Sequence, residues 1–216
     1  ERHGVCIVGY TDGTFGPSRS MTRSEAAAIF ARLLAEKNGD TISTAANTKF
    51  ADIPAHAWYS GYVKYLSNNG ITHGKSKTIF APNDAITRAE FTTMAVRFFD
   101  VYGDGDAEIM EQFSGFNDVS SGYWAAEYIK YAALHGWING YGDGSFHADR
   151  EINRAEVVTI VNRLLGREAD EDYIADNLRK LNTFPDVTKR HWAYYAVMEA
   201  ANAHTAVLGE SESWSK

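Results

Sequence analysis

The sequence of 216 residues predicts a mainly α-helical protein made of three copies of one unit. Three observations predict this fold: a helix-capping motif, a Phe-x-Asp segment followed by a tryptophan, and a glycine-rich loop each recur along the chain. The arginines of the capping motif, Arg23, Arg88 and Arg154, are 65 and 66 residues apart. A constant period of this length is typical of repeat proteins, in which each unit buries its apolar face against a neighbour.

The capping motif indicates where one helix of each unit begins. A Thr or Asn stands three residues before a Glu in residues 21–25, 86–90 and 152–156, and an apolar run follows. In a capping box of this spacing the first side chain accepts a hydrogen bond from a backbone N–H of the new helix, and the Glu accepts one from the N–H of the capping residue. Apolar residues then recur with the helical period, so one face of each helix is predicted to lie in the core. The predicted helix ends are Gly39, Gly103 and Gly166.

The capping-motif arginines are candidate ligand-binding residues. Each occupies the first helical position, where the positive end of the helix dipole makes a cation unfavourable by roughly 0.3–1 kcal/mol. One explanation is an anion site, since a guanidinium and free N–H groups at a helix N-terminus together bind carboxylates and phosphates. The alternative is structural: the arginine pairs with a neighbouring acid or packs its stem on an aromatic ring. The pattern leaves both explanations open.

The Phe-x-Asp motif indicates a second helix in each unit. It runs from Phe to Trp over residues 50–58, 116–124 and 184–192, and small and apolar residues follow at helical spacing. Such narrow apolar faces favour close helix–helix approach, so these helices are expected to pack on the capping-box helices.

Two side chains of this motif are candidate ligand contacts. The aspartate is expected to cap the second helix or to accept hydrogen bonds in a turn, with a ligand contact as the alternative. The tryptophan is expected either to stack on a sugar or to lie in the core. The residues concerned are Asp52, Asp118, Asp186, Trp58, Trp124 and Trp192.

The third motif predicts a tight loop between the two helices of a unit. Gly-Tyr-x-Asp-Gly-x-Phe occupies residues 9–15 and 140–146, while the middle copy, residues 74–80, keeps only the first Gly and the Phe. Asp-Gly pairs are typical of tight turns because Gly adopts positive φ without strain. The loop glycine and tyrosine are expected to contact a ligand, and a lysine supplies charge in the middle copy. These candidates are Gly9, Tyr10, Gly140, Tyr141 and Lys75.

The order of the motifs divides the chain into two complete units flanked by two half-units. Residues 1–49 form the C-terminal half of a unit, 50–115 and 116–183 are complete units, and 184–216 form an N-terminal half that ends in a polar tail. We expect the last half-unit to dock on residues 1–49 and to complete a third unit from both ends of the chain. Residues 167–183 are predicted to add an amphipathic helix.

Composition and charge argue against several classes of protein. No apolar run approaches the roughly 18 residues of a membrane span and no signal-peptide pattern is present, so the segment is expected to be soluble, either as a mature chain or as an excised piece. A net charge of −7 without any cluster of Lys and Arg argues against nucleic acid as a partner. Any anionic ligand must therefore be held by a few local cations.

No metal, cofactor or catalytic site is expected. The single cysteine, Cys6, excludes an internal disulfide and a cysteine zinc cage. None of the seven histidines forms a His-Glu-x-x-His pair. An acidic segment fails the register of a calcium-binding EF-hand and is expected to be a solvated loop. Its acidic residues are Asp100, Asp104, Asp106, Glu108 and Glu111.

Together, the Thr-Arg-Ala-Glu, Gly-Tyr-x-Asp-Gly-x-Phe and Phe-x-Asp-Val-x-x-x-x-Trp motifs resemble those of S-layer homology (SLH) domains over nearly the whole chain. The resemblance implies three pseudo-threefold repeats that form a central helical bundle with three projecting prongs. It also implies a secreted protein anchored non-covalently to the bacterial cell surface. Ligands of this family are secondary cell-wall polysaccharides, often ending in a pyruvylated amino sugar and held in grooves between prongs. The family's ligand-contacting arginine corresponds to Arg23, Arg88 and Arg154.

The sequence therefore favours a non-enzymatic carbohydrate-binding anchor. Its expected partner is a pyruvylated amino-sugar polymer or a peptidoglycan-linked glycan. The middle loop, which lacks Tyr-x-Asp-Gly, is expected to form an altered or silent groove. The alternative is a protein–protein scaffold that self-associates in a surface layer or docks an attached domain. An envelope-processing enzyme is a third hypothesis, for which no motif argues.

Overall fold

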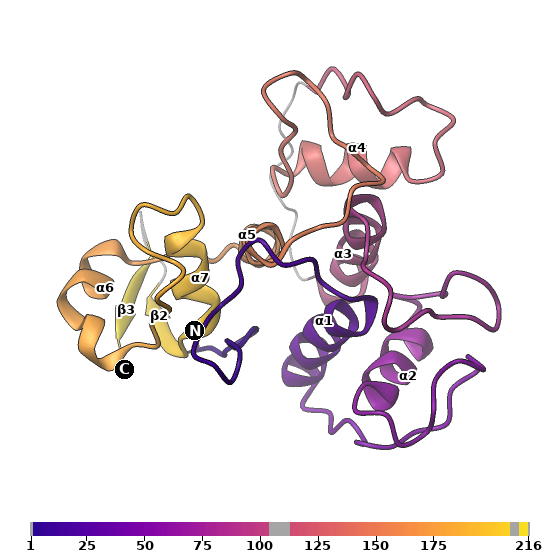
Figure 1. Cartoon of the computed structure of the whole chain (residues 1–216), viewed down its shortest axis with the longest axis horizontal. Helices are drawn as coiled ribbons and strands as arrows, with labels where there is room; N and C mark the ends of the chain where they lie inside the picture. Colours follow the sequence, from indigo (N-terminus) through magenta and orange to yellow (C-terminus); the bar gives the residue numbers. More distant parts are fainter. Residues whose placement is uncertain (1, 104–112, 208–211, 216) are drawn as a thin grey trace. The chain divides into compact units, whose positions relative to one another are not determined.

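A computed structural model describes residues 2–103, 113–207 and 212–215 of the chain. In these ranges the chain forms seven α-helices, one 3₁₀ turn and a three-stranded sheet (Figure 1). The predicted mainly α fold is therefore confirmed. None of the helices in these ranges has the length and hydrophobicity that a membrane crossing needs.

The chain folds into two compact units. The terminal unit contains residues 1–19 and 153–216, and the central unit contains residues 20–152. Four residues of the predicted acidic loop, Asp104, Asp106, Glu108 and Glu111, lie outside the described residues.

Three helices begin at the predicted capping boxes. They are α1 (Arg23–Asn38), α3 (Arg88–Tyr102) and α5 (Arg154–Leu164). In each, the side chain of the capping Thr or Asn accepts from the backbone N–H of the Glu three residues on, and that Glu side chain accepts from the capping residue's own N–H. All three capping boxes are therefore confirmed, and with them the N-terminus of each helix.

The predicted glycines follow the C-terminal ends of these helices. Gly39 is the capping residue of α1 and adopts a φ of 68°. Gly166 adopts a φ of 64° directly after the capping residue of α5, whereas Gly103 ends α3 in an extended conformation. Only two of the three glycines therefore use the left-handed conformation that favours glycine.

Three shorter helices follow the Phe-x-Asp motifs: α2 (Ser60–Asn68), α4 (Ala126–Leu134) and α7 (Tyr194–Ala201). Each packs on the capping-box helix that precedes it in the sequence, so that α2 contacts α1, α4 contacts α3 and α7 contacts α5 (Figure 1). Within the central unit α1 also packs on α3, as the predicted helical bundle requires. Helix pairing thus crosses the boundaries of the units that the motifs define.

The predicted helix in residues 167–183 is shorter than expected. Helix α6 (Glu171–Asn177) is capped by Asp170 and continues into the 3₁₀ turn η1 (Leu178–Lys180). Ile174 is buried, but Leu178 is 42% exposed. Only the first part of the predicted apolar face therefore lies in the core.

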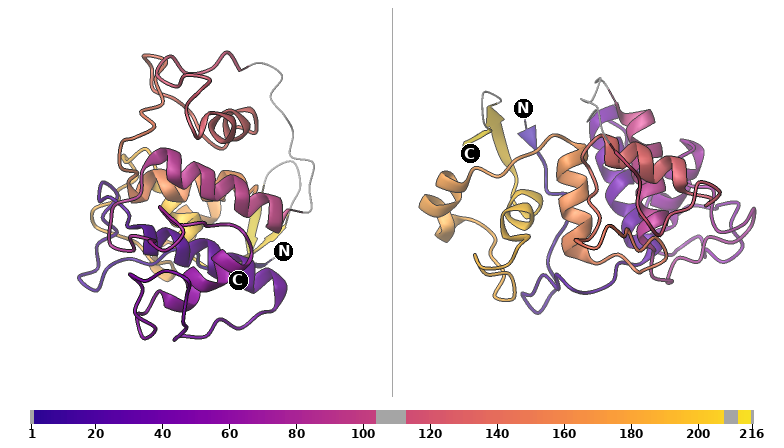
Figure 2. Two further views of the ribbon diagram at one scale, coloured as in Figure 1. Left: turned by 90° about the vertical axis from the view of Figure 1, so that its right-hand side faces the viewer. Right: turned by 90° about the horizontal axis from the view of Figure 1, so that it is seen from above.

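The C-terminal tail contributes two strands to a small sheet in the terminal unit. Strand β2 (His204–Val207) pairs antiparallel with β1 (Arg2–His3) on one side and with β3 (Ser213–Ser215) on the other. Figures 1 and 2 show the N-terminal strand beside the C-terminal ones. These strands were not predicted from the sequence, because strands of two to four residues are too short to produce a recognisable alternation.

Candidate functional site

Each capping-box arginine lies against one glycine loop, and this contact recurs three times. Its Nε donates to the carbonyl oxygen of the loop phenylalanine at 2.7–2.8 Å, and its guanidinium lies 4.5–5.0 Å from the centre of the same phenyl ring. The pairs are Arg23 with Phe80, Arg88 with Phe146, and Arg154 with Phe15. We call them the Arg23, Arg88 and Arg154 clusters. The first two lie in the central unit and the third in the terminal unit.

Loop carbonyls also occupy the first N–H groups of each capping-box helix. The N–H of Arg23 donates to Asp84 at 2.9 Å, and that of Ser24 donates to Pro82 at 3.0 Å. The equivalent pairs are Arg88 to Arg150, Ala89 to Ala148, Arg154 to Arg19, and Ala155 to Pro17. The third N–H of each helix is taken by the capping side chain. The predicted anion site on free amide protons of the helix N-terminus is therefore wrong.

The three arginines are buried, with exposed fractions of 4–5%. Nη1 of Arg23 also forms an ion pair with Oε1 of Glu90, the capping-box acid of α3, at 3.1 Å. The structural alternative, an arginine that pairs with an acid and packs on an aromatic ring, therefore holds at Arg23. A direct ligand contact by Arg23, Arg88 or Arg154 stays a proposal.

The motif aspartates hold the same loops. Each carboxylate accepts hydrogen bonds from two consecutive backbone N–H groups at 2.7–2.9 Å. The pairs are Asp52 with Phe80 and Ala81, Asp118 with Phe146 and His147, and Asp186 with Phe15 and Gly16. The expected capping of the tryptophan helices was wrong, because α2, α4 and α7 begin several residues later and have no side-chain cap.

Two of these aspartates have lowered pKa values. Burial alone would raise the pKa of Asp118, but the N–H groups of Phe146 and His147 outweigh it and bring the pKa below 3.8. Burial opposes the N–H groups of Phe15 and Gly16 in the same way at Asp186, and its pKa is also lowered. The bond between Asp186 and the loop of residues 9–16 supports the proposed completion of a third unit from both chain ends.

The first glycine of each loop makes room for the phenylalanine of the Phe-x-Asp motif. A Cβ at Gly140 would overlap the ring of Phe116, and the same holds for Gly9 with Phe184 and Gly74 with Phe50. Gly9 and Gly140, predicted as ligand contacts, thus have a packing role. The middle loop keeps this packing although only the first Gly and the Phe of its motif remain.

The ring of each loop tyrosine is close to the guanidinium groups of two arginines. Arg154 and Arg19 lie 4.7 and 4.1 Å from the ring centre of Tyr10. Arg88 and Arg150 lie 5.2 and 5.6 Å from that of Tyr141. Arg19 and Arg150 are exposed, unlike the capping-box arginines.

Sequence reasoning missed Arg19 and Arg150. Each follows its loop tyrosine by nine residues, which is the signal that could have identified them. In the middle loop the same two positions hold Lys75 and Asp84, which form an exposed ion pair at 3.2 Å. An aromatic–cation contact is thus replaced by an ion pair, and the charge of Lys75 is partly neutralised.

The three motif tryptophans are on the surface. Trp58, Trp124 and Trp192 are 54%, 57% and 66% exposed, so the core alternative was wrong. Tyr123, which precedes Trp124, donates a 2.6 Å hydrogen bond to Asp149 in the segment after the glycine loop. Burial and this bond raise the pKa of Tyr123 to about 12. This hydrogen bond ties the residue that precedes Trp124 to the segment that follows the glycine loop of residues 140–146.

Two surface hollows are lined in part by residues of α4. They measure about 300 and 320 Å³ and are lined by residues within 113–130 and 96–134. Neither lining includes any of the candidate ligand-binding residues.

Comparison with known proteins finds three matches to one domain family along the chain. The S-layer homology domain model matches residues 1–27, 49–92 and 115–158. Cell surface glycoprotein 1 of Acetivibrio thermocellus is 33% identical over 218 residues, which cover 97% of this chain and 9% of that protein. The cellulosome-anchoring protein of the same organism is 30% identical, over 97% of this chain and 44% of that protein.

A third relative comes from another organism. The surface-layer 125 kDa protein of Lysinibacillus sphaericus is 32% identical, over 74% of this chain and 13% of that protein. The chain thus spans less than half the length of each of these relatives. By its family match and these identities, the chain belongs to the S-layer homology domain family and is an anchoring module of the bacterial cell surface.

Proposed function

We propose that the chain anchors its parent protein by binding an anionic polysaccharide of the cell wall at the Arg88 and Arg154 clusters. The observation that carries the proposal is the exposure of Trp58, Trp124 and Trp192 at the same position of every unit. A large aromatic ring is costly to leave in water, and its flat face is suited to stacking on a sugar. The name of the cellulosome-anchoring relative is consistent with such a role.

The exposed arginines supply the positive charge that an acidic sugar needs. The whole chain carries a net charge of −7, so attraction must come from local cations. Arg19 and Arg150 are exposed beside Tyr10 and Tyr141, and a guanidinium can grip a carboxylate with two parallel hydrogen bonds. Beneath them, the buried Arg154 and Arg88 hold the loops in place.

The Arg23 cluster is proposed to bind weakly or not at all. Asp84 occupies the position of the exposed arginine and is paired with Lys75. A carboxylate at this place repels an anionic ligand instead of gripping it. Trp58 remains available for stacking, so this cluster contributes contact area without charge recognition.

A pyruvylated amino sugar is the proposed ligand, because its ketal supplies a carboxylate within a polysaccharide. The test is a pull-down of the purified chain on cell-wall sacculi before and after chemical removal of pyruvyl groups. Binding that falls at least tenfold after removal supports the ligand. Undiminished binding would refute the pyruvyl ketal and leave the anchoring role to other wall polymers.

Two sets of variants test the residues. Replacing Trp58, Trp124 and Trp192 by alanine is expected to reduce binding to sacculi at least tenfold, whereas Leu178→Ala, which removes another exposed apolar side chain, in η1, leaves it unchanged. Arg19→Ala with Arg150→Ala is expected to weaken binding without altering thermal unfolding. Wild-type affinity in either set would contradict the assignment.

Variants of the buried arginines must be tested for folding as well as for binding. Replacing Arg23, Arg88 and Arg154 together is expected to abolish binding, but the loops they hold would also collapse. Circular dichroism and the midpoint of thermal unfolding must therefore accompany the measurement. If the triple variant stays folded and binds sacculi as the wild type does, the arginines have no part in recognition.

Exposed tryptophans are also typical of protein interfaces, so the scaffold alternative has an observation in its favour. Analytical ultracentrifugation of the chain without glycan distinguishes the two functions. Concentration-dependent self-association that the tryptophan variants lose would favour the scaffold.

A further inference from the structure

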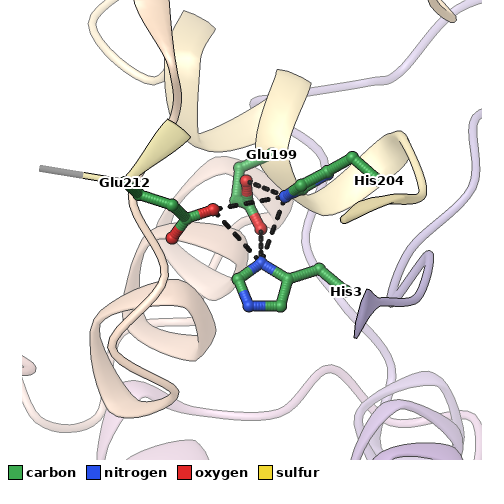
Figure 3. Close-up of side chains that lie close together, drawn as sticks. All are labelled: His3, Glu199, His204 and Glu212. Carbon is green, nitrogen blue, oxygen red and sulfur yellow. Dashed lines mark hydrogen bonds and ion pairs between the residues drawn. The ribbon is translucent and has the colours of Figure 1, made fainter. Parts of the chain in front are cut away.

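Four ionisable side chains converge inside the terminal unit, and none of them belongs to the Arg154 cluster. They are His3 on β1, Glu199 on α7, His204 on β2, and Glu212 just before β3. Figure 3 shows all four directed at one point between these elements. Their exposed fractions are 2%, 1%, 5% and 8%. We call this group the His–Glu cluster.

The distances within the His–Glu cluster match a metal-coordination polyhedron. Nδ1 of His3 and Nε2 of His204 lie 3.1 Å apart. The carboxylate oxygens lie 3.1–3.3 Å from these two nitrogens. Ligand atoms that surround Zn²⁺ at 2.0–2.1 Å in a tetrahedron are about 3.3–3.4 Å from one another. The cluster is therefore nearly the right size for one small divalent cation.

Hydrogen bonding alone leaves this arrangement incomplete. Nδ1 of His204 lies 2.9 Å from the carbonyl oxygen of Asn202, which only accepts, so this nitrogen carries a proton. In the neutral ring the lone pair of Nε2 therefore points inward, toward the two carboxylates. His3 has at most one proton at Nδ1 to share among three facing atoms. Oε2 of Glu199 is buried and accepts no hydrogen bond of adequate geometry, although it lies 3.2 Å from Nε2 of His204. A buried carboxylate oxygen of this kind needs a cation.

The surroundings hold the ligand side chains in place. The ring of Trp214 stacks on that of His204 at a centroid distance of 3.8 Å, and its Nε1 donates to Oε1 of Glu212 at 2.9 Å. The Asn202 carbonyl fixes the tautomer of His204. Metal-binding histidines and carboxylates are typically oriented by such outer hydrogen bonds.

We propose that the His–Glu cluster binds one divalent transition-metal ion, for which Zn²⁺ is the best match. Two imidazole nitrogens and two carboxylates favour Zn²⁺ over Ca²⁺ and Mg²⁺, which prefer six or more oxygen ligands. The charge of a divalent ion balances that of the two carboxylates. Bound there, the ion joins the first residues of the chain to its last ones and stabilises the folded terminal unit.

The test uses the whole chain without a histidine tag, freed of metal by a chelator and then titrated with ZnCl₂ in a calorimeter. One ion per chain is expected, confirmed by elemental analysis after gel filtration. A Zn²⁺ concentration of about 100 times Kd is expected to raise the midpoint of thermal unfolding by about 5–10 °C. Cobalt substitution is expected to give the intense visible absorption of a four-coordinate ion.

Variants locate the ion. His3→Ala and Glu199→Gln are each expected to lose the stoichiometric binding and the thermal shift, while His73→Ala, which removes an exposed histidine of the central unit, keeps both. Circular dichroism establishes that each variant is folded, and two ligand variants are used so that misfolding of one does not decide the result. Absence of stoichiometric Zn²⁺ binding by the folded wild type, or unchanged binding by both ligand variants, would overturn the proposal.

Discussion

An arginine at the first position of a helix is unfavourable, yet here the position is used three times. The cost from the helix dipole is roughly 0.3–1 kcal/mol. A buried hydrogen bond from a charged donor contributes about 1.5–3 kcal/mol, and each arginine makes one to a loop phenylalanine carbonyl. The bond to the loop therefore outweighs the dipole. The repeated arginine has a structural cause whether or not it also touches a ligand.

The loop glycines give a prediction at the scale of single atoms. Gly140→Ala is expected to destabilise the chain by roughly 1–3 kcal/mol, because the added Cβ would overlap the Phe116 ring and the Ser145 carbonyl. Gly142→Ala, two residues away, meets nothing within 4 Å and should change the free energy of unfolding by less than about 0.5 kcal/mol. Urea denaturation of both variants provides the measurement. Equal effects at the two positions would mean that the ring contact is unimportant.

At the scale of elements, each glycine loop is fastened at two places. The aspartate of a Phe-x-Asp motif accepts from two loop N–H groups, and a capping-box arginine donates to a loop carbonyl. The aspartate lies in the segment before a tryptophan helix, and the arginine is the first residue of a capping-box helix. The loop therefore links these two helices. The loop geometry thus depends on two charged groups. The charge of the aspartate carboxylate changes with pH, whereas the arginine guanidinium stays protonated.

This fastening predicts an acid-sensitive stability. The pKa of Asp118 and that of Asp186 are lowered from 3.8, so their contribution is fully present above that pH and is lost as the pH falls through the lower folded-state values. Asp118→Asn is expected to cost roughly 1–3 kcal/mol at pH 7. The difference from wild type should shrink as the pH falls below 3.8, because the unfolded wild-type chain binds the proton first and the native carboxylate binds it only below its lowered pKa. Urea unfolding between pH 2.5 and 7 measures it, and a difference that does not depend on pH would exclude this role.

At the scale of the whole molecule, the three clusters are equivalent in backbone and unequal in charge. The same glycine, aspartate and arginine contacts recur in all three. Only the clusters of Arg88 and Arg154 carry a tyrosine with an exposed arginine, whereas the Arg23 cluster carries Lys75 and Asp84. Binding to the wall through several clusters at once raises the overall avidity, so a weak Arg23 cluster limits it.

Giving the Arg23 cluster the tyrosine and arginine of the other two clusters tests this difference in charge. The double variant Lys75→Tyr with Asp84→Arg recreates the arrangement of the other two loops and is expected to increase apparent affinity for sacculi severalfold through a third charged contact. Asp84→Arg alone places two cations together and should give less. Retention on immobilised sacculi at increasing salt measures the change. A double variant that binds no better than wild type would argue against an anionic ligand at this loop.

Much of the fold could be predicted because it depends on short-range spacing. The capping boxes at Thr22, Thr87 and Asn153 were recognisable since both partners lie within one helical turn. Short-range spacing gave a wrong prediction for Asp118. Its position in the sequence is typical of a helix cap, but its carboxylate accepts from N–H groups 28 and 29 residues away. The tryptophans could not be assigned to core or surface, because a ring's exposure depends on what the rest of the fold covers.

The sequence by itself determined the number of repeats, the starts of their main helices and the family, because each rests on residues within a few positions of one another. Only the tertiary structure decided which loop each arginine holds, that Trp58, Trp124 and Trp192 face the solvent, and that His3 meets His204. The last pair is separated by 201 positions. Contacts over such separations arise from the packing of the whole terminal unit, and no spacing along the chain encodes them.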